Sequence, residues 1–146
     1  MQIDKNDALT AGIMLGDGSI GISKRRDSRP GRRCYFRLWI SVHNTEKVFL
    51  TWLKRNYRGS ICAYKSRRNK TRFKGRKQVY AWAPKPSDYK QFLVAILPYL
   101  MGNKLKRAKL MLEFLAAGTS KAPPDAVYTK RRRKQVLLWR KCRAIG

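Results

Sequence analysis

The most regular pattern of apolar and polar positions lies between residues 34 and 42, where the two kinds of side chain alternate. A period of two places successive side chains on opposite faces of a β-strand. One face carries Phe36, Leu38, Ile40 and Val42, and the other carries Tyr35, Arg37, Trp39 and Ser41. The second face mixes aromatic and cationic groups, so it is not a simple solvated surface.

Helical spacing of apolar residues appears on both sides of this strand. A first helix is expected from about Asp4, which can cap it, to Leu15. Further helices are expected from Thr45 to the segment closed by Gly59, at about 88–97 with Ser87 as cap, at about 104–116, and from Asp125 onward. Further strands are expected at about 20–25, 60–65 and 77–83. The order is therefore αββαββ followed by helices, and the sequence contains no second copy of its first helix.

The charge of the chain narrows the classes of partner. The 146 residues include 35 Lys and Arg against 8 Asp and Glu, a formal net charge of +27. Such a charge repels itself unless a polyanion neutralises it, and nucleic acid is the commonest polyanion. A membrane surface is less suited, because the basic residues occur in almost every segment instead of on one amphipathic helix.

The cysteines and the ends of the chain add two exclusions. Cys34, Cys62 and Cys142 are far apart and form no CxxC pair, and the only histidine is His43. A zinc site needs about four close ligands, so the cysteines are expected to be reduced thiols of an intracellular protein. No signal peptide is evident, and no stretch approaches the ~20 apolar residues that span a bilayer.

Two glycines in the first helix point to a close contact. Gly12 and Gly16 lie four residues apart on one helix face, although each costs roughly 1 kcal/mol relative to Ala. Close approach of another helix is a compensating reason, either from the same subunit or from a partner. The helix then ends at Gly16-Asp17-Gly18-Ser19, where Asp17 is either an ordinary turn residue or a functional acid.

Residues 9–20, which read LTAGIMLGDGSI, resemble the LAGLIDADG signature of homing endonucleases. Thr10 replaces the first Leu of the nine-residue core and Leu15 replaces its first Asp, while the final Asp-Gly is kept. Residues 40–47 and 97–110 resemble later segments of the same family. The resemblance covers about residues 4–117 and is closest to single-motif homodimeric enzymes encoded in organellar introns. We therefore divide the chain into a core of residues 1–118 and a basic helical extension of residues 119–146, packed on that core.

The resemblance implies an α+β fold, in which each subunit has a four-stranded antiparallel DNA-binding sheet with helices on its other face. It also implies a metal-dependent, staggered double-strand break in a long pseudo-palindromic DNA site, made by a homodimer. Two motif helices would pack side by side through Ala11, Gly12, Leu15 and Gly16. The catalytic residues would be Asp17, Asn44, Lys47 and Lys104. Asp17 and the Gly16 carbonyl would bind Mg²⁺, for which Mn²⁺ is a plausible substitute.

The sheet would read double-stranded DNA in the major groove, where base edges carry a distinguishable code. Strand alternation nominates Ser23, Arg25, Tyr35, Arg37, Trp39, Ser41, Cys62, Tyr64, Ser66, Gln78, Tyr80 and Trp82. Basic residues near the hairpin tips would hold distal phosphates, namely Arg32, Arg33, Arg67, Arg68, Arg72, Lys74 and Arg76.

Other interpretations remain open at the level of sequence. Asn44 can cap the following helix, Lys47 and Lys104 can be ordinary surface cations, Trp39 can be buried, and His43 can be a general base. An RNA-splicing maturase or a non-cleaving DNA-binding regulator on the same fold is the alternative function. A basic RNA- or ribosome-binding protein would explain the charge but not the glycines and the acid.

Overall fold

The computed structural model describes residues 4–25, 35–63, 77–118 and 125–145, with side chains of the last helix from residue 130. The elements are α1 (Lys5–Gly16), β1 (Gly18–Arg25), β2 (Tyr35–Asn44), α2 (Lys47–Tyr57), β3 (Ser60–Ala63), β4 (Tyr80–Ala83), η1 (Pro86–Asp88), α3 (Tyr89–Ile96), η2 (Leu97–Tyr99), α4 (Gly102–Ala116) and α5 (Asp125–Ala144). The predicted αββαββ order followed by helices is confirmed.

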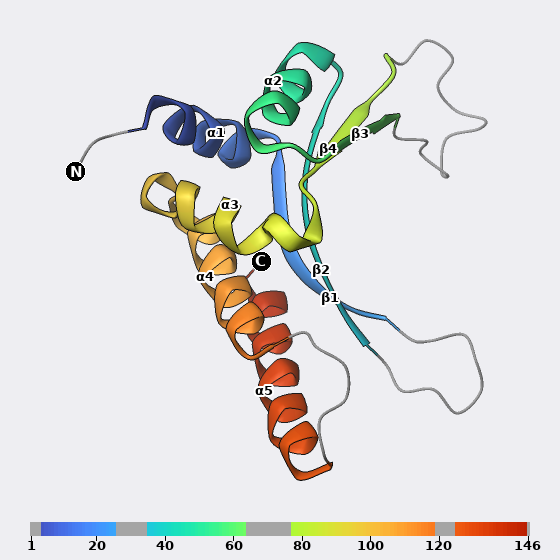
Figure 1. The fold of residues 1–146 in the computed structure, drawn as a ribbon, viewed down its shortest axis with the longest axis vertical. Coiled ribbons are helices and arrows are strands. Elements are labelled where there is room, and N and C mark those ends of the chain that lie inside the picture. The colour runs from blue at the N-terminus through green and yellow to red at the C-terminus, as the bar shows by residue number, and fades with distance from the viewer. Residues whose placement is uncertain (1–3, 26–34, 64–76, 119–124, 146) are drawn as a thin grey trace.

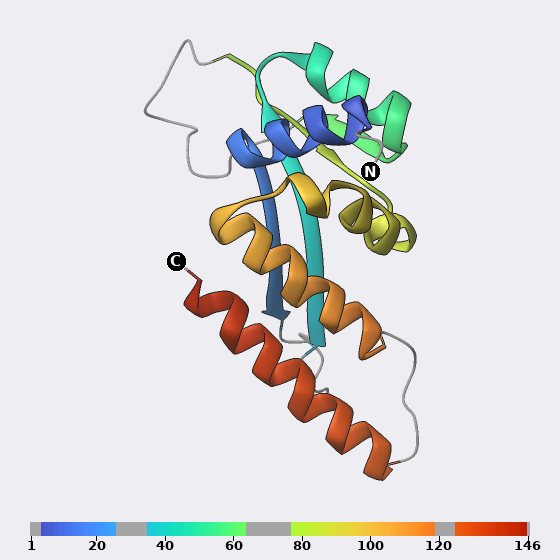
Figure 2. The same cartoon turned by 90° about the vertical axis from the view of Figure 1, so that its left-hand side faces the viewer.

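The four strands form one antiparallel sheet in the order β1-β2-β4-β3. The helices lie together on one side of this sheet, as the two perpendicular views show (Figures 1 and 2). The other side of the sheet is free of described helices. The predicted α+β architecture is therefore confirmed, including the open face of the sheet.

Strand register explains which side chains form the core. Ile20 pairs with Ile40, and both side chains are buried on the face of the β1–β2 pair that the helices cover. Val42 continues the same face and pairs with Trp82 of β4. Ile20, Ile40, Val42 and Trp82 are almost fully buried together with Met14 of α1, so sheet and helices share one hydrophobic core.

The predicted helix starts have mixed outcomes. Asp4 caps α1 as expected, because its carboxylate accepts a hydrogen bond from the Asn6 N–H at 2.8 Å. The cap predicted at Ser87 is wrong. Ser87 lies inside the short η1 turn, which begins at Pro86, and its hydroxyl donates to Asp88 at 2.8 Å instead. The helix α3 begins only at Tyr89, without a side-chain cap.

Helix α5 packs on the lower part of the sheet and on α4 (Figures 1 and 2). Its Leu138 and Cys142 are buried against Ile22 of β1 and Phe114 of α4, forming a second small apolar cluster. Phe36 joins this cluster from β2. No helix within the described ranges is both long and apolar enough to cross a membrane.

Candidate functional site

Asp17 lies at the point where α1 ends and β1 begins. It is exposed, and it is the C-terminal cap residue of α1, with its N–H bonded to the Ile13 carbonyl at 2.9 Å. The next residue must be glycine, because a Cβ at Gly18 would lie 2.6 Å from the Cα of Met14. The tight Asp-Gly turn therefore presents the Asp17 carboxylate at the surface, directly beside the first strand of the sheet.

Asn44 fixes the orientation of this carboxylate. Its side-chain amide donates to Asp17 Oδ2 at 2.6 Å, while its side-chain oxygen accepts from the Glu46 N–H at 2.7 Å. The His43 N–H also donates to the Asp17 backbone carbonyl, at 3.3 Å. Asn44 thus ties the end of β2 to the acid and orders the turn before α2, but it does not cap that helix, because the N-cap residue is Glu46.

Lys104, from the start of α4, supports the same turn from the inside. Its ammonium donates to the carbonyls of Met14 at 2.6 Å, of Leu15 at 3.1 Å, and of Gly18. Burial lowers the pKa of Lys104, and the nearby Asp17 partly opposes this shift. Two of these bonds satisfy orphan carbonyls at the end of α1 and the third satisfies the carbonyl of Gly18 at the start of β1, so Lys104 is a positioning residue for the Asp17 turn.

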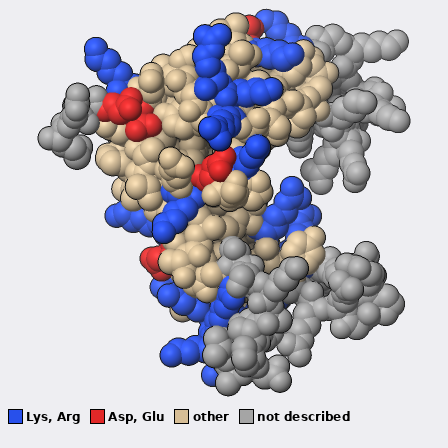
Figure 3. Space-filling view, in the orientation of Figure 1, with Lys and Arg blue, Asp and Glu red and all other residues tan. Residues whose placement is uncertain are grey.

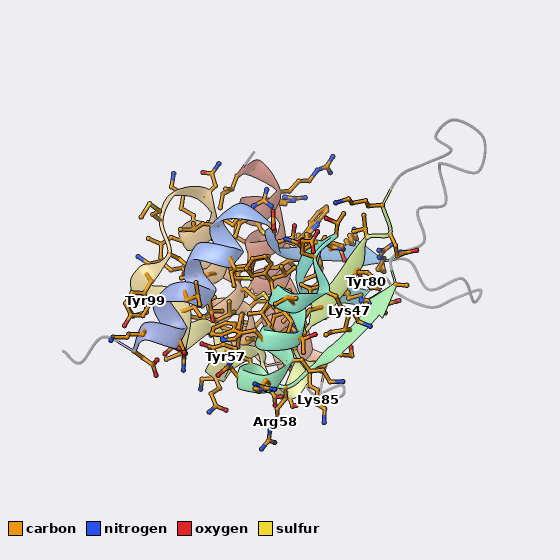
Figure 4. The ribbon with its side chains drawn as sticks, turned by 90° about the horizontal axis from the view of Figure 1, so that it is seen from above. Lys47, Tyr57, Arg58, Tyr80, Lys85 and Tyr99 are labelled. Atoms are coloured by element: carbon orange, nitrogen blue, oxygen red, sulfur yellow. The ribbon has the colours of Figure 1, made fainter. Side chains whose placement is uncertain are left out.

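Lys47 lies at the start of α2, away from these contacts. Its ammonium is 5.3 Å from the centroid of the Tyr80 ring, a cation–π arrangement that Figure 4 shows between α2 and β4. The neighbouring Glu46 approaches Lys77 at 3.9 Å, and both side chains are well exposed. The structure thus brings Asp17, Asn44 and Lys104 together, whereas the described contact of Lys47 is with Tyr80.

The donor atoms at the turn suit a hard divalent cation only in part. The Asp17 carboxylate and the adjacent backbone carbonyls are the oxygen ligands that Mg²⁺ prefers. Within the described residues, no group of three or more His, Cys, Asp or Glu side chains could hold a metal ion. Such a site fits Mg²⁺ when phosphate oxygens and water complete the coordination, as is usual for Mg²⁺ on nucleotide substrates.

A shallow groove of about 430 Å³ runs along α1 beside Asp17. It is lined by Leu9, Gly12, Ile13 and Gly16 of α1 and by Phe49 of α2. A Cβ added at Gly12 or Gly16 would meet no described atom within 4 Å, apart from the helix's own backbone and its chain neighbours. The two glycines are therefore not required for packing against the described part of this subunit.

The four predicted interface residues differ in their exposure. Ala11 is fully buried in the core of its own subunit, so its assignment to a subunit interface is wrong. The reason is helical geometry, since residue 11 is rotated by about 100° from residue 12. Leu15 is half-buried against the same core, while Gly12 and Gly16 stay exposed.

The open face of the sheet carries most of the described residues that strand alternation nominated. Ile20, Ile22, Ile40 and Val42 point into the core, so the intervening side chains of β1 and β2 point the other way. Cys62 faces Ala81 and joins this open face from β3. The nominated residues on it are Ser23, Arg25, Tyr35, Arg37, Trp39, Ser41 and Cys62.

The prediction for β4 is wrong by one position. Trp82 pairs with the core residue Val42, is 0% exposed, and donates from Nε1 to the Arg58 carbonyl at 2.8 Å. Tyr80 shares that face and lies close to Lys47 (Figure 4). The open face of β4 carries Ala81 instead, opposite His43 of β2. Extending the β2 alternation from Ser41 to His43 would have found His43, which sequence reasoning did not place on this face.

The other nominated residues have different outcomes. Gln78 is exposed and precedes β4, so strand alternation does not apply to it. A further set of nominated residues lies outside the described ranges, namely Arg32, Arg33, Tyr64, Ser66, Arg67, Arg68, Arg72, Lys74 and Arg76. In Figure 3, Lys and Arg are spread over the visible surface and acidic residues occupy only a few separate spots.

Comparison with known proteins gives a structural likeness without a sequence match. No protein-family model and no curated protein sequence matches the chain. The homing endonuclease I-CvuI, solved in complex with DNA, superposes with a TM-score of 0.70 at 19% identity, over 96% of this chain and 81% of that one. The archaeal intron-encoded homing endonuclease I-Vdi141I, solved with DNA, gives 0.69 at 12% identity, over 96% and 83%. The LAGLIDADG homing endonuclease I-LtrWI, bound to target DNA, gives 0.66 at 13% identity, with 97% of this chain covering 45% of that one.

This chain has the fold of the LAGLIDADG homing endonucleases. The shared fold was the expectation from residues 9–20, and it is confirmed over nearly the whole chain. In this LAGLIDADG fold, Asp17 occupies the end of the motif helix and the open sheet carries the aromatic and cationic residues. At identities below a fifth, the likeness concerns the fold, and the chemistry rests on the residues of the site.

Proposed function

We propose that this chain is a sequence-specific, divalent-metal-dependent DNA endonuclease that acts as a homodimer. Its product would be a staggered double-strand break in a long pseudo-palindromic site. The observation that carries the proposal is the exposed Asp17 carboxylate, which Asn44 orients at 2.6 Å beside the glycine-lined groove of α1. A protein that only binds DNA does not need an acid held in this way beside phosphates.

The groove supports a second copy of the chain as the partner. Leu9 is 53% exposed and Phe49 is 50% exposed, and they flank the exposed Gly12 and Gly16. An exposed apolar stripe with two glycines suits close packing of another helix. Because the chain has one motif, two copies related by a twofold axis would bring two Asp17 residues near that axis. The Asp17 of each copy would then act in the cleavage of one DNA strand.

The acid would work together with a bound metal. When bound, Mg²⁺ supplies stabilisation of negative charge at the scissile phosphate. Asp17 and the Gly16 carbonyl would hold it, with Mn²⁺ as a substitute. Asn44 keeps the carboxylate in one orientation, and Lys104 keeps the carbonyls at the end of α1 in place. These roles need no side-chain base, and His43 lies on the open face of the sheet, opposite Ala81.

The open sheet face would bind the DNA. Arg37 is exposed on it, and Ser23, paired with Arg37 across the strands, donates to the Arg37 carbonyl at 3.2 Å. A cationic side chain on a rigid, twisted pair of strands can reach base edges in the major groove. The net charge of +27 adds attraction to the phosphate backbone that is independent of DNA sequence.

Selection of cleaved sites from a random duplex DNA library, with Mg²⁺ present, tests this function. We expect one enriched, approximately palindromic site with staggered ends, and no enrichment with EDTA. Enrichment of bound but uncleaved DNA would favour the non-cleaving regulator instead. Binding of intron RNA without any enriched duplex would favour the maturase.

A further inference from the structure

A second hollow lies at the free edge of β1, where the open face of the sheet meets α5. Its volume is about 350 Å³. Gly21 and Trp39 contribute from the open face, while Trp139 and Arg143 contribute from α5. Lys24 of β1 and Arg107 of α4 complete the part of the wall that matters here. The hollow therefore adjoins the sheet face proposed to bind DNA, while residues of α4 and α5 form the rest of its wall.

The indole of Trp39 has a fixed place in this wall. Trp39 pairs with Gly21 across the strands, and a Cβ at Gly21 would lie 2.6 Å from the indole ring. Glycine at residue 21 therefore lets the ring pack directly on the β1 backbone. A ring held in this way borders the hollow and is not free to follow a base edge.

Three cations line the hollow, and two of them lie against an aromatic ring. The Lys24 ammonium lies 5.5 Å and the Arg143 guanidinium 6.0 Å from the centroid of the Trp139 ring. Arg107 donates from Nη2 to the Ile145 carbonyl near the end of α5, which ties α4 to that end. Among the described residues that line the hollow, none is acidic. Three cations gathered without an acid repel one another until an anion enters.

We propose that this hollow binds one phosphodiester group, with its deoxyribose, of the DNA strand that lies on the sheet. The cations match the phosphate, and the Trp39 indole offers an apolar wall for the sugar. The inference rests on the proposed DNA-binding function and extends it to α4 and α5. It gives the C-terminal helix a stated role, since α5 supplies both Trp139 and Arg143.

A pair of variants on one helix tests the site. Arg143→Ala removes a cation of the hollow, whereas Lys141→Ala removes an equal charge from an exposed position two residues away. With the full chain and its selected DNA site, we expect Arg143→Ala to weaken binding about tenfold, as for a hydrogen bond to a charged group. The slope of the logarithm of the binding constant against the logarithm of the salt concentration should fall by an amount that corresponds to about one phosphate contact. Lys141→Ala should weaken binding less than about twofold, and equal losses in the two variants overturn the proposal.

Modified DNA locates the contact. Target duplexes that carry one uncharged methylphosphonate at successive positions should weaken wild-type binding most at one symmetry-related pair of linkages. At that pair, Arg143→Ala should lose little more, because the two changes remove the same contact. Additive losses at every position contradict the proposal. Unchanged thermal unfolding of Arg143→Ala, and partial rescue by Arg143→Lys, exclude misfolding as the cause.

Two further outcomes separate the possible failures. Titration with inorganic phosphate at constant ionic strength, followed by tryptophan fluorescence, should show much weaker binding than that of the DNA site, because free phosphate makes no other contact with the sheet. Phosphate binding that is as tight as DNA binding, and that Arg143→Ala abolishes, would assign the hollow to a free anion and overturn the DNA contact. If wild-type protein binds no DNA site at all, the proposed function fails. If it binds and Arg143 behaves like Lys141, only the inference about the hollow fails.

Discussion

The side-chain amide of Asn44 donates to the carboxylate of Asp17 across 2.6 Å, joining the end of β2 to the end of α1. Since the other side of the same amide group accepts from the Glu46 N–H, Asn44 cannot turn without losing a second bond. This pairing makes the orientation of the acid a property of the whole strand–helix junction.

Replacing Asn44 should impair cleavage more than binding. Asn44→Ala removes the bond that orients Asp17, and misplacement of a catalytic group by about 1 Å can lower a rate by up to ~100-fold. We expect a 10- to 100-fold lower single-turnover cleavage rate with DNA affinity within about twofold. Asn56→Ala is the matched control, because Asn56 also donates its amide, but to the Trp52 carbonyl on the far part of α2. Equal rates for Asn44→Ala and wild type would remove the orienting role.

A substitution at a glycine of α1 should weaken association of the two subunits without unfolding either one. Gly12→Leu adds a side chain where the subunit has open space, so the monomer should fold while the dimer dissociates. Sedimentation velocity should show the monomer, and thermal unfolding should show a folded chain. Gly18→Ala is the contrasting variant, since its Cβ would clash with the Met14 backbone, and it should lower the thermal stability directly. A dimer of Gly12→Leu as tight as wild type would contradict the assigned interface.

How far the sequence reaches can be seen by comparing β2 with β4. The alternation over residues 34–42 placed Arg37 and Trp39 on the open face, because nine residues define a period clearly. The four residues of β4, Tyr-Ala-Trp-Ala, are all apolar or aromatic, so their pattern cannot tell one face from the other. Only pairing of Asn44 with Tyr80 and of Val42 with Trp82 fixes their direction.

Contacts between residues far apart in the sequence also limit what the sequence predicts about the surroundings of Asp17. The motif in residues 9–20 singled out Asp17, and helical spacing placed Gly12 and Gly16 on one face of the first helix. The sequence could nominate Lys104 only by resemblance, because its bonds reach carbonyls 86 to 90 residues away. Likewise, nothing local connects Trp139 with Lys24, which meet only because α5 packs against β1.

Tyr57 provides a prediction about stability at high pH. Its hydroxyl donates to Asp7 Oδ1 at 2.6 Å between α2 and α1 (Figure 4), and burial raises its pKa above the usual value of 10.0, with Asp7 adding to the shift. Because the pKa of Tyr57 is higher in the folded chain than in the unfolded chain, the protonated hydroxyl contributes its full stabilisation below pH 10. This stabilisation is lost as the pH rises above 10. Tyr57→Phe should lower the free energy of unfolding by about 1–2 kcal/mol at pH 7 and flatten the alkaline decline. Urea unfolding at pH 7 and above pH 10 measures both; an alkaline decline identical to that of wild type would contradict this assignment.

Arg37 should determine base preference at one symmetric pair of positions in the DNA site. Arg37→Ala should cost about 1–3 kcal/mol against the preferred base if the contact is bidentate, and should relax the preference there. Competition binding with singly substituted sites measures this change. Arg55→Ala is the control, because Arg55 is exposed on α2, on the helical side of the sheet. A uniform loss over all sites would make Arg37 a phosphate contact.

The central claim is that Asp17 is the acid of a metal-dependent nuclease. Asp17→Asn keeps the size of the side chain and an oxygen that can accept from Asn44, but removes the negative charge that would bind Mg²⁺. The measurement is cleavage and binding of the selected DNA site by this variant, side by side, with Mg²⁺ present. We predict wild-type affinity and no cleavage of either strand, whereas cleavage at the wild-type rate would contradict the role of Asp17.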